Sequence, residues 1–179
     1  MTAVLLLAGC GGGDDDAEPS AAPPAASASA SAPATSTTDP DAADKAALLA
    51  SYTSMWDEQM KAYRKADAKG TDLKKYAALN ALSKFEADLA HMKKNNTVIQ
   101  GELGHNAKVT AVDTAGKLPK ATVQDCVDLA KWQTLDTKTG KPIPLPTSQP
   151  LRYVATATAE KWPDGWMITD YTPDGARTC

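Results

Sequence analysis

The 179-residue sequence lacks long hydrophobic runs and contains few residues suited to catalysis. No run approaches the roughly 18 apolar residues of a membrane-spanning helix, so any membrane attachment has to come from the N-terminus. Only two histidines occur, His91 and His105, and their spacing does not match H-E-x-x-H or another metal-binding pattern. A G-x-S-x-G motif, from which a hydrolase triad could start, is absent as well. We therefore expect neither a metal nor a cofactor. We interpret His91 as a surface residue at a helix end and place His105 in a turn.

Basic residues are absent from the first 44 positions. Residues 1–43 hold six carboxylates and no Lys or Arg, a charge of −6, whereas residues 44–179 hold 19 basic and 16 acidic residues, a charge of +3. Nucleic-acid-binding domains carry a clustered basic face, which a charge of +3 over this length does not provide. We expect no nucleic-acid partner.

Residues 11–43 contain no aromatic or branched aliphatic side chain. Such a segment cannot bury enough apolar area to offset the entropy lost on ordering. It therefore predicts a disordered tether in front of a single globular domain, residues 44–179.

The globular part begins with helical patterns and continues with strand patterns. Apolar residues recur every three or four positions in two stretches, the first between Asp41 or Asp44 and Gly70, the second from Thr71 to about Asn96. Strands are expected at 98–103, 107–112, 121–127 and 151–161, and Asp164-Gly165 predicts a hairpin turn. Helices followed by strands indicate an α+β fold, with N-terminal helices packed on a curved, mostly antiparallel sheet.

One face of the longest expected strand carries Tyr153 followed by Ala155, Ala157 and Ala159. Small side chains either let a helix approach closely or leave room for a cavity, and we favour packing. If a cavity exists, it lies between the first helix and the sheet and is lined by Tyr52, Trp56, Trp132 and Tyr153.

Acid–base chemistry could use Asp125, Asp128 or Asp170. A carboxyl group that faces inward beside aromatic residues would have a raised pKa suited to proton transfer. Nothing in the sequence places these residues inward, so we expect solvated carboxylates and retain Asp125 and Asp170 as weak catalytic candidates.

The segment Leu7–Cys10, LAGC, resembles the lipobox of bacterial lipoproteins. The resemblance implies that Cys10 is acylated and anchors the chain to the outer face of the cell membrane, outside the cytoplasm. Only six apolar residues and no basic residue precede it, so residues 1–10 look like a truncated signal segment whose true start lies upstream.

Acylation of Cys10 would leave Cys126 and Cys179 as the remaining cysteine pair. In an oxidising compartment this pair predicts a disulfide. The alternative is two free thiols with Cys126 as a nucleophile, which the neighbouring Asp125 and Asp128 disfavour because anions oppose thiolate formation.

Two further resemblances concern the domain itself. Residues 70–77, 125–128 with Trp132, 152–162 and 177–179 resemble a group of uncharacterised exported lipoproteins from actinobacteria. The order of elements is similar to the NTF2-like cone fold, which includes isomerases, dehydratases and binding modules. No catalytic residue follows from either resemblance.

Three functions are therefore open. The first is a lipid-anchored domain that binds a small apolar ligand or an envelope protein partner without catalysis. The second is an extracytoplasmic NTF2-like enzyme of the isomerase or dehydratase type with an Asp general base. The third is an envelope spacer or assembly subunit, which would have an exposed apolar patch and no pocket.

Overall fold

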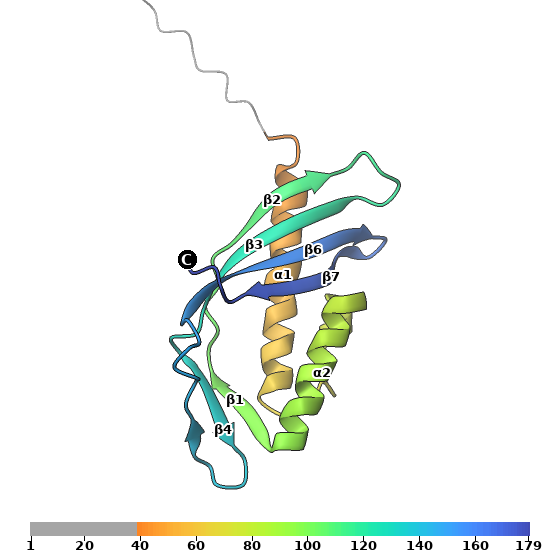
Figure 1. Cartoon of the computed structure of the whole chain (residues 1–179). Helices are drawn as coiled ribbons and strands as arrows, with labels where there is room; N and C mark the ends of the chain where they lie inside the picture. Colours follow the sequence, from red (N-terminus) through yellow and green to blue (C-terminus); the bar gives the residue numbers. More distant parts are fainter. Residues whose placement is uncertain (1–38) are drawn as a thin grey trace, which may run out of the picture. The chain divides into compact units, whose positions relative to one another are not determined.

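The computed structural model describes residues 39–179, which belong to one compact unit. Two α-helices precede two antiparallel sheets (Figure 1), which confirms the α+β expectation. The strands form no closed barrel, and the NTF2-like cone stays a prediction. Cys10, the signal segment and nearly all of the expected tether lie outside the described residues. Between residues 39 and 179, no helix is long and apolar enough to cross a membrane.

Helix α1 spans Ala42–Tyr63 and ends earlier than predicted. Ala66 takes a left-handed conformation with φ of 50°, and the Asp67 N–H donates to Ala62 O at 3.1 Å. This backbone pattern closes the helix in the way that a glycine usually does. The expectation that Gly70 ends the helix is therefore wrong, because Ala66 takes that role.

A short 3-10 helix, η1 (Leu73–Lys75), leads into α2 (Leu79–Asn95). Asn96 ends α2 in the left-handed region, with φ of 54°. The structure confirms a second helix in this region. Its predicted start at Thr71 is wrong, because the 3-10 helix and an extended Ala78 precede the first residue of α2, Leu79.

The larger sheet has the order β2-β3-β6-β7, and every neighbouring pair is antiparallel. Its strands are β2 (Ala107–Asp113), β3 (Lys120–Asp128), β6 (Arg152–Trp162) and β7 (Gly165–Asp174). The Asp-Gly hairpin is confirmed with a small shift, because Gly165 already pairs with Trp162 and the turn consists of Pro163 and Asp164.

The smaller sheet, β1-β4-β5, continues the larger one through a bent hairpin. It contains β1 (Thr97–Gly101), β4 (Trp132–Asp136) and β5 (Pro142–Ile143). β1 pairs with β4 up to Gly101, a bridge joins Gly104 to Asp128, and β2 then pairs with β3. The chain turns a corner between Gly101 and Gly104, which gives the strands their curvature.

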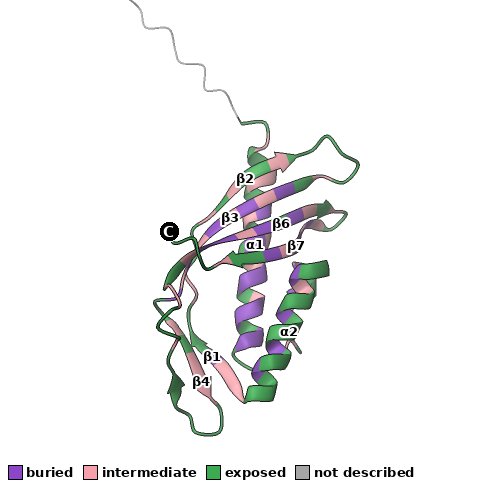
Figure 2. Cartoon of the chain, in the orientation of Figure 1, coloured by how far each residue is buried: buried purple, intermediate pink, exposed green. Residues whose placement is uncertain are grey.

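The helices lie on one side of the larger sheet, and the core is buried between them (Figures 1 and 2). Ala155, Ala157 and Ala159 are at most 1% exposed. Aromatic residues fill the space around this row: Tyr52 of α1 reaches Asp125, which pairs with Ala155, and Tyr171 pairs with Ala157. The small residues thus make room for large aromatic side chains.

Candidate functional site

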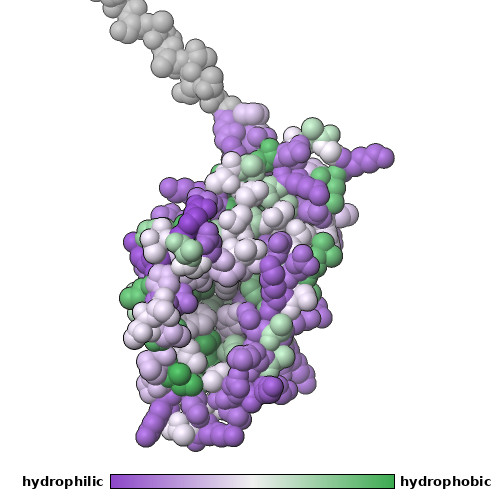
Figure 3. Space-filling model, viewed as in Figure 1, coloured by the Kyte–Doolittle hydropathy of each residue, from purple (hydrophilic) through white to green (hydrophobic). Residues whose placement is uncertain are grey.

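A cavity of about 380 Å³ lies between both helices and the strands. We call it the main cavity. In Figure 3 the surface is hollowed between α2 and the paired strands β1 and β4, with apolar groups inside the hollow. Three of the four expected pocket residues, Trp56, Trp132 and Tyr153, line it, whereas Tyr52 does not. Its other lining residues are Tyr63, Lys84, Phe85, Asp88, Leu103, Leu129, Leu145, Gln149, Tyr171 and Pro173.

Aromatic rings hold one another in place around the main cavity. Trp56 of α1 makes edge contacts with Phe85 at 5.5 Å and with Tyr171 at 5.1 Å between ring centroids. Tyr63 contacts Trp132 in the same manner at 5.9 Å. Such pairs stabilise each other beyond the area that they bury, so the wall has a defined shape.

The charged groups at the main cavity already have partners. Lys84 Nζ lies 2.7 Å from Asp170 Oδ1 and donates to Tyr171 O at 2.9 Å. The Asp88 carboxylate accepts a hydrogen bond from Tyr63 Oη at 3.0 Å. Burial raises the pKa of Tyr63, Tyr153 and Tyr171, which keeps these phenols neutral at physiological pH. The site therefore suits an uncharged ligand.

Asp125 is buried, which corrects the expectation of a solvated edge carboxylate. β3 lies between β2 and β6, and the Asp125 side chain is 1% exposed. Asp170 and Asp128 are about two-fifths exposed, as expected, with side-chain exposures of 38% and 39%. The hydrogen bond from Lys84 lowers the pKa of Asp170, which makes this carboxylate a weaker base than a free aspartate.

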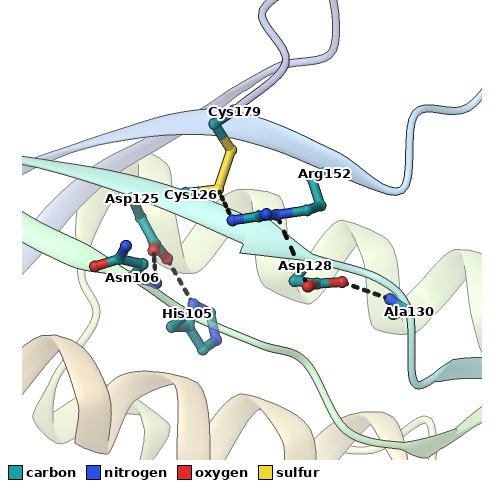
Figure 4. Close-up of a disulfide and its surroundings, with 8 residues drawn as sticks. All are labelled: His105, Asn106, Asp125, Cys126, Asp128, Ala130, Arg152 and Cys179. Carbon is teal, nitrogen blue, oxygen red and sulfur yellow. Dashed lines mark hydrogen bonds and ion pairs between the residues drawn. A yellow bond between two sulfur atoms is a disulfide. The ribbon is translucent and has the colours of Figure 1, made fainter.

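Three donors surround the Asp125 carboxylate (Figure 4 shows two of them). Tyr52 Oη donates to Oδ2 at 2.9 Å, His105 Nδ1 lies 2.5 Å from the same oxygen, and the Asn106 N–H donates to Oδ1 at 2.8 Å. The interpretation of His105 as an ordinary turn residue is therefore incomplete, because its ring contacts the core carboxylate.

His105 also borders a second opening of about 290 Å³, which we call the histidine cleft. The cleft runs along α1 on the other side of Trp56, and Trp56 and Leu103 separate it from the main cavity because they line both. Tyr52, the fourth expected pocket residue, lies here. Its remaining lining residues are Leu49, Thr53, Asp57, Met60 and Ala107.

Cys126 and Cys179 form the expected disulfide, with Cα atoms 5.9 Å apart. Cys126 follows Asp125 on β3, so the two side chains project from opposite faces of the strand (Figure 4). Arg152 lies beside the bond, with Nη2 3.2 Å from Cys126 Sγ. The last residue of the chain is thereby attached to the centre of the larger sheet.

His91 behaves as expected for a surface residue and contacts Asn95 at 2.7 Å. Within residues 39–179, no group of three or more His, Cys, Asp or Glu side chains could hold a metal ion.

Comparisons with known proteins give limited information. No protein-family model matches the chain, and no curated protein sequence matches it either. The intermembrane space region of the chloroplast protein ARC6 is similar in structure, with 15% identity and a TM-score of 0.43 over 72% of this chain and 96% of that chain. The Kfla4162 protein from Kribbella flavida has 13% identity and a TM-score of 0.40 over 76% of this chain and 93% of that chain. Likenesses at this level identify no family, so the lipoprotein and NTF2-like resemblances stay predictions.

Proposed function

We propose that the domain binds a small, uncharged and largely apolar ligand in the main cavity. The observation that carries the proposal is the 380 Å³ cavity with aromatic walls and internally paired charges. This volume falls in the range of about 300–1,000 Å³ typical of small-molecule sites. Trp56 Nε1 and Tyr171 Oη are buried in its wall and make no hydrogen bond within residues 39–179, so small side-chain movements could offer them to a polar group of the ligand.

The disulfide supports a location outside the cytoplasm, where such bonds persist. Together with the lipobox resemblance it favours a domain anchored by a lipid on Cys10. Palmitate labelling of the full chain tests the anchor. Label that disappears in Cys10→Ala supports it, and unchanged label and membrane fractionation in that variant would overturn it.

Binding is tested with the fluorescent probe N-phenyl-1-naphthylamine. We expect saturable fluorescence enhancement, and a dissociation constant raised at least about tenfold, or about 1.4 kcal/mol, by Leu145→Trp. Leu145 lines the main cavity from a partly exposed position in the loop after β5, so a larger side chain fills the space without entering the core. Leu118→Trp is the matched control, because Leu118 is 39% exposed in the β2–β3 loop. Equal affinities in both variants and the unmodified domain would contradict the proposal.

The other functions receive less support. A spacer or assembly subunit would need no cavity, and the exposed large hydrophobic residues between positions 39 and 179 are scattered: Leu79, Leu118, Ile143 and Leu151. Because these exposed hydrophobic residues form no patch, they also give little support to a protein partner that binds through an apolar surface. An enzyme with an Asp base meets a different obstacle, because both oxygens of Asp125 already accept hydrogen bonds and Asp170 is paired with Lys84.

A further inference from the structure

His105 has the surroundings of an oriented base. Its Nδ1 lies 2.5 Å from Oδ2 of the buried Asp125, and in the tautomer that donates Nδ1–H to this carboxylate the free lone pair of the ring is on Nε2. The ring lies against Trp56 with centroids 5.1 Å apart, and the ring of Tyr52 stands nearly perpendicular to it with centroids 6.1 Å apart. The ring is therefore held on three sides.

The second ring nitrogen is the one available to a further partner. Nδ1 is directed at Asp125, so Nε2 is the nitrogen that remains for a group bound beside the ring. The side chain is 25% exposed and borders the histidine cleft, and Nε2 has no hydrogen-bond partner within residues 39–179. A lone pair on an oriented ring in a cleft is the arrangement that general base catalysis requires.

We propose that His105 is a general base that removes a proton from an uncharged carbon acid bound in the histidine cleft, with Asp125 as its positioning residue. Nε2 takes the proton, the electron pair of the broken C–H bond stays on the substrate, and the Asp125 carboxylate stabilises the imidazolium. The proton later returns to solvent or to product. The titratable groups beside the ring are Asp125 and Tyr52, and Asp57 lines the same cleft.

The substrate class follows from the lining of the cleft. Leu49, Met60, Leu103 and Ala107 offer apolar surface, and no Lys or Arg lines the cleft to bind an anion. A flat, neutral molecule with an acidified C–H bond fits this chemistry. This activity goes beyond the binding function proposed for the main cavity and lies in a separate site.

The experiment uses 5-nitrobenzisoxazole, a flat neutral carbon acid. When its C–H proton is removed, the C–H electron pair becomes the third bond of a nitrile and the ring N–O bond breaks with its own pair moving onto oxygen. A coloured phenolate forms without any co-reactant. We expect saturable turnover by the domain and a loss of at least about tenfold in His105→Gln, since a positioned base contributes roughly 10²–10⁴-fold. His91→Gln, which changes the only other histidine, should leave the rate unchanged.

The positioning role is tested separately. Asp125→Asn should lower the rate and shift its pH profile, because the carboxylate that stabilises the imidazolium is lost. Asp128→Asn, which changes a partly exposed carboxylate on the same strand outside the cleft, should stay within about twofold. Each variant is first checked for a folded spectrum and an intact disulfide. Equal turnover in the unmodified domain and His105→Gln would overturn the proposal. Leu145→Trp should leave turnover intact, which separates failure here from failure of ligand binding in the main cavity.

Discussion

At the scale of single residues, Asp125 connects parts of the chain that are far apart in sequence. Its carboxylate joins α1 through Tyr52, the β1–β2 connection through His105 and Asn106, and the centre of the larger sheet through β3. Burying a carboxylate is costly unless its oxygens are hydrogen-bonded, and three donors meet that requirement. The same contacts that stabilise the fold thus orient the histidine.

Replacement of Asp125 by alanine should destabilise the domain by about 3 kcal/mol, because Tyr52 Oη and the Asn106 N–H lose their acceptor inside the protein. Denaturant unfolding at neutral pH measures the change. Asp170→Ala is the control: its ion pair with Lys84 is partly exposed, and its loss should cost no more than about 1 kcal/mol. Similar losses in the two variants would show that the Asp125 network contributes no more than a surface pair.

The sequence pattern contains enough information to predict that Asp125 is buried, but it does not show which residues contact its carboxylate. Ala121, Val123 and Val127 alternate with more polar residues in β3, and Asp125 falls on the same face as these buried residues. A carboxylate in that pattern could have been interpreted as inward. His105 precedes β2 in an irregular segment, and only the pairing of β2 with β3 brings it to Asp125. Such a contact has no local signal.

At the scale of elements, the bent hairpin that joins the two sheets depends on Gly101. Its φ is 82°, and a Cβ atom there would lie 2.0 Å from the Lys131 carbonyl oxygen on the facing strand. Because that obstacle is backbone, it can move only by opening the β1–β4 pair.

Gly101→Ala should therefore unfold the corner of the hairpin and cost several kcal/mol, at least about 2 more than Gly140→Ala. Gly140 is a matched control, because its φ is also positive at 68° but no atom lies within 4 Å of the added carbon. Unfolding midpoints and hydrogen exchange of the β1 and β4 amides measure the effect. Equal destabilisation by the two substitutions would mean that the close approach to Lys131 is unimportant.

Periodicity identified both helices and most long strands, but it did not identify β4 and β5. These strands have five and two residues, and their side chains are intermediate or exposed, so they lack an alternating pattern. They form because β4 extends the paired β3 beyond the corner. The end of α1 was misplaced for a related reason: Ala66 takes a left-handed conformation that sequence rules assign to glycine.

At the scale of the whole molecule, buried tyrosines link stability to alkaline pH. Burial raises the pKa of Tyr52, Tyr63 and Tyr171 above its usual value of about 10. The folded domain therefore keeps protons that the unfolded chain releases above pH 10. The stabilisation is complete below about pH 10 and is lost as the pH rises further.

The free energy of unfolding should fall by up to about 1.4 kcal/mol per pH unit for each of these tyrosines between about pH 10 and 12. Urea unfolding at several pH values measures the slope, and tyrosinate absorbance should rise together with unfolding. Tyr63→Phe should reduce the slope by up to one tyrosine's share. A slope that is unchanged in this variant would assign the alkaline loss to other groups.

The disulfide connects the C-terminus to the middle of the sheet and acts on the whole chain. Cys126 and Cys179 are 53 positions apart, so the bond restricts a long loop in the unfolded state. For a loop of this size, chain entropy predicts that Cys179→Ser lowers the free energy of unfolding by about 4 kcal/mol. That is a large share of the roughly 5–15 kcal/mol typical of a domain, so the reduced form should unfold at much lower urea concentration.

Reductant should shift the unmodified protein to the midpoint of Cys179→Ser and leave the variant itself unaffected. A midpoint that does not respond to reductant would mean that the bond contributes nothing to stability.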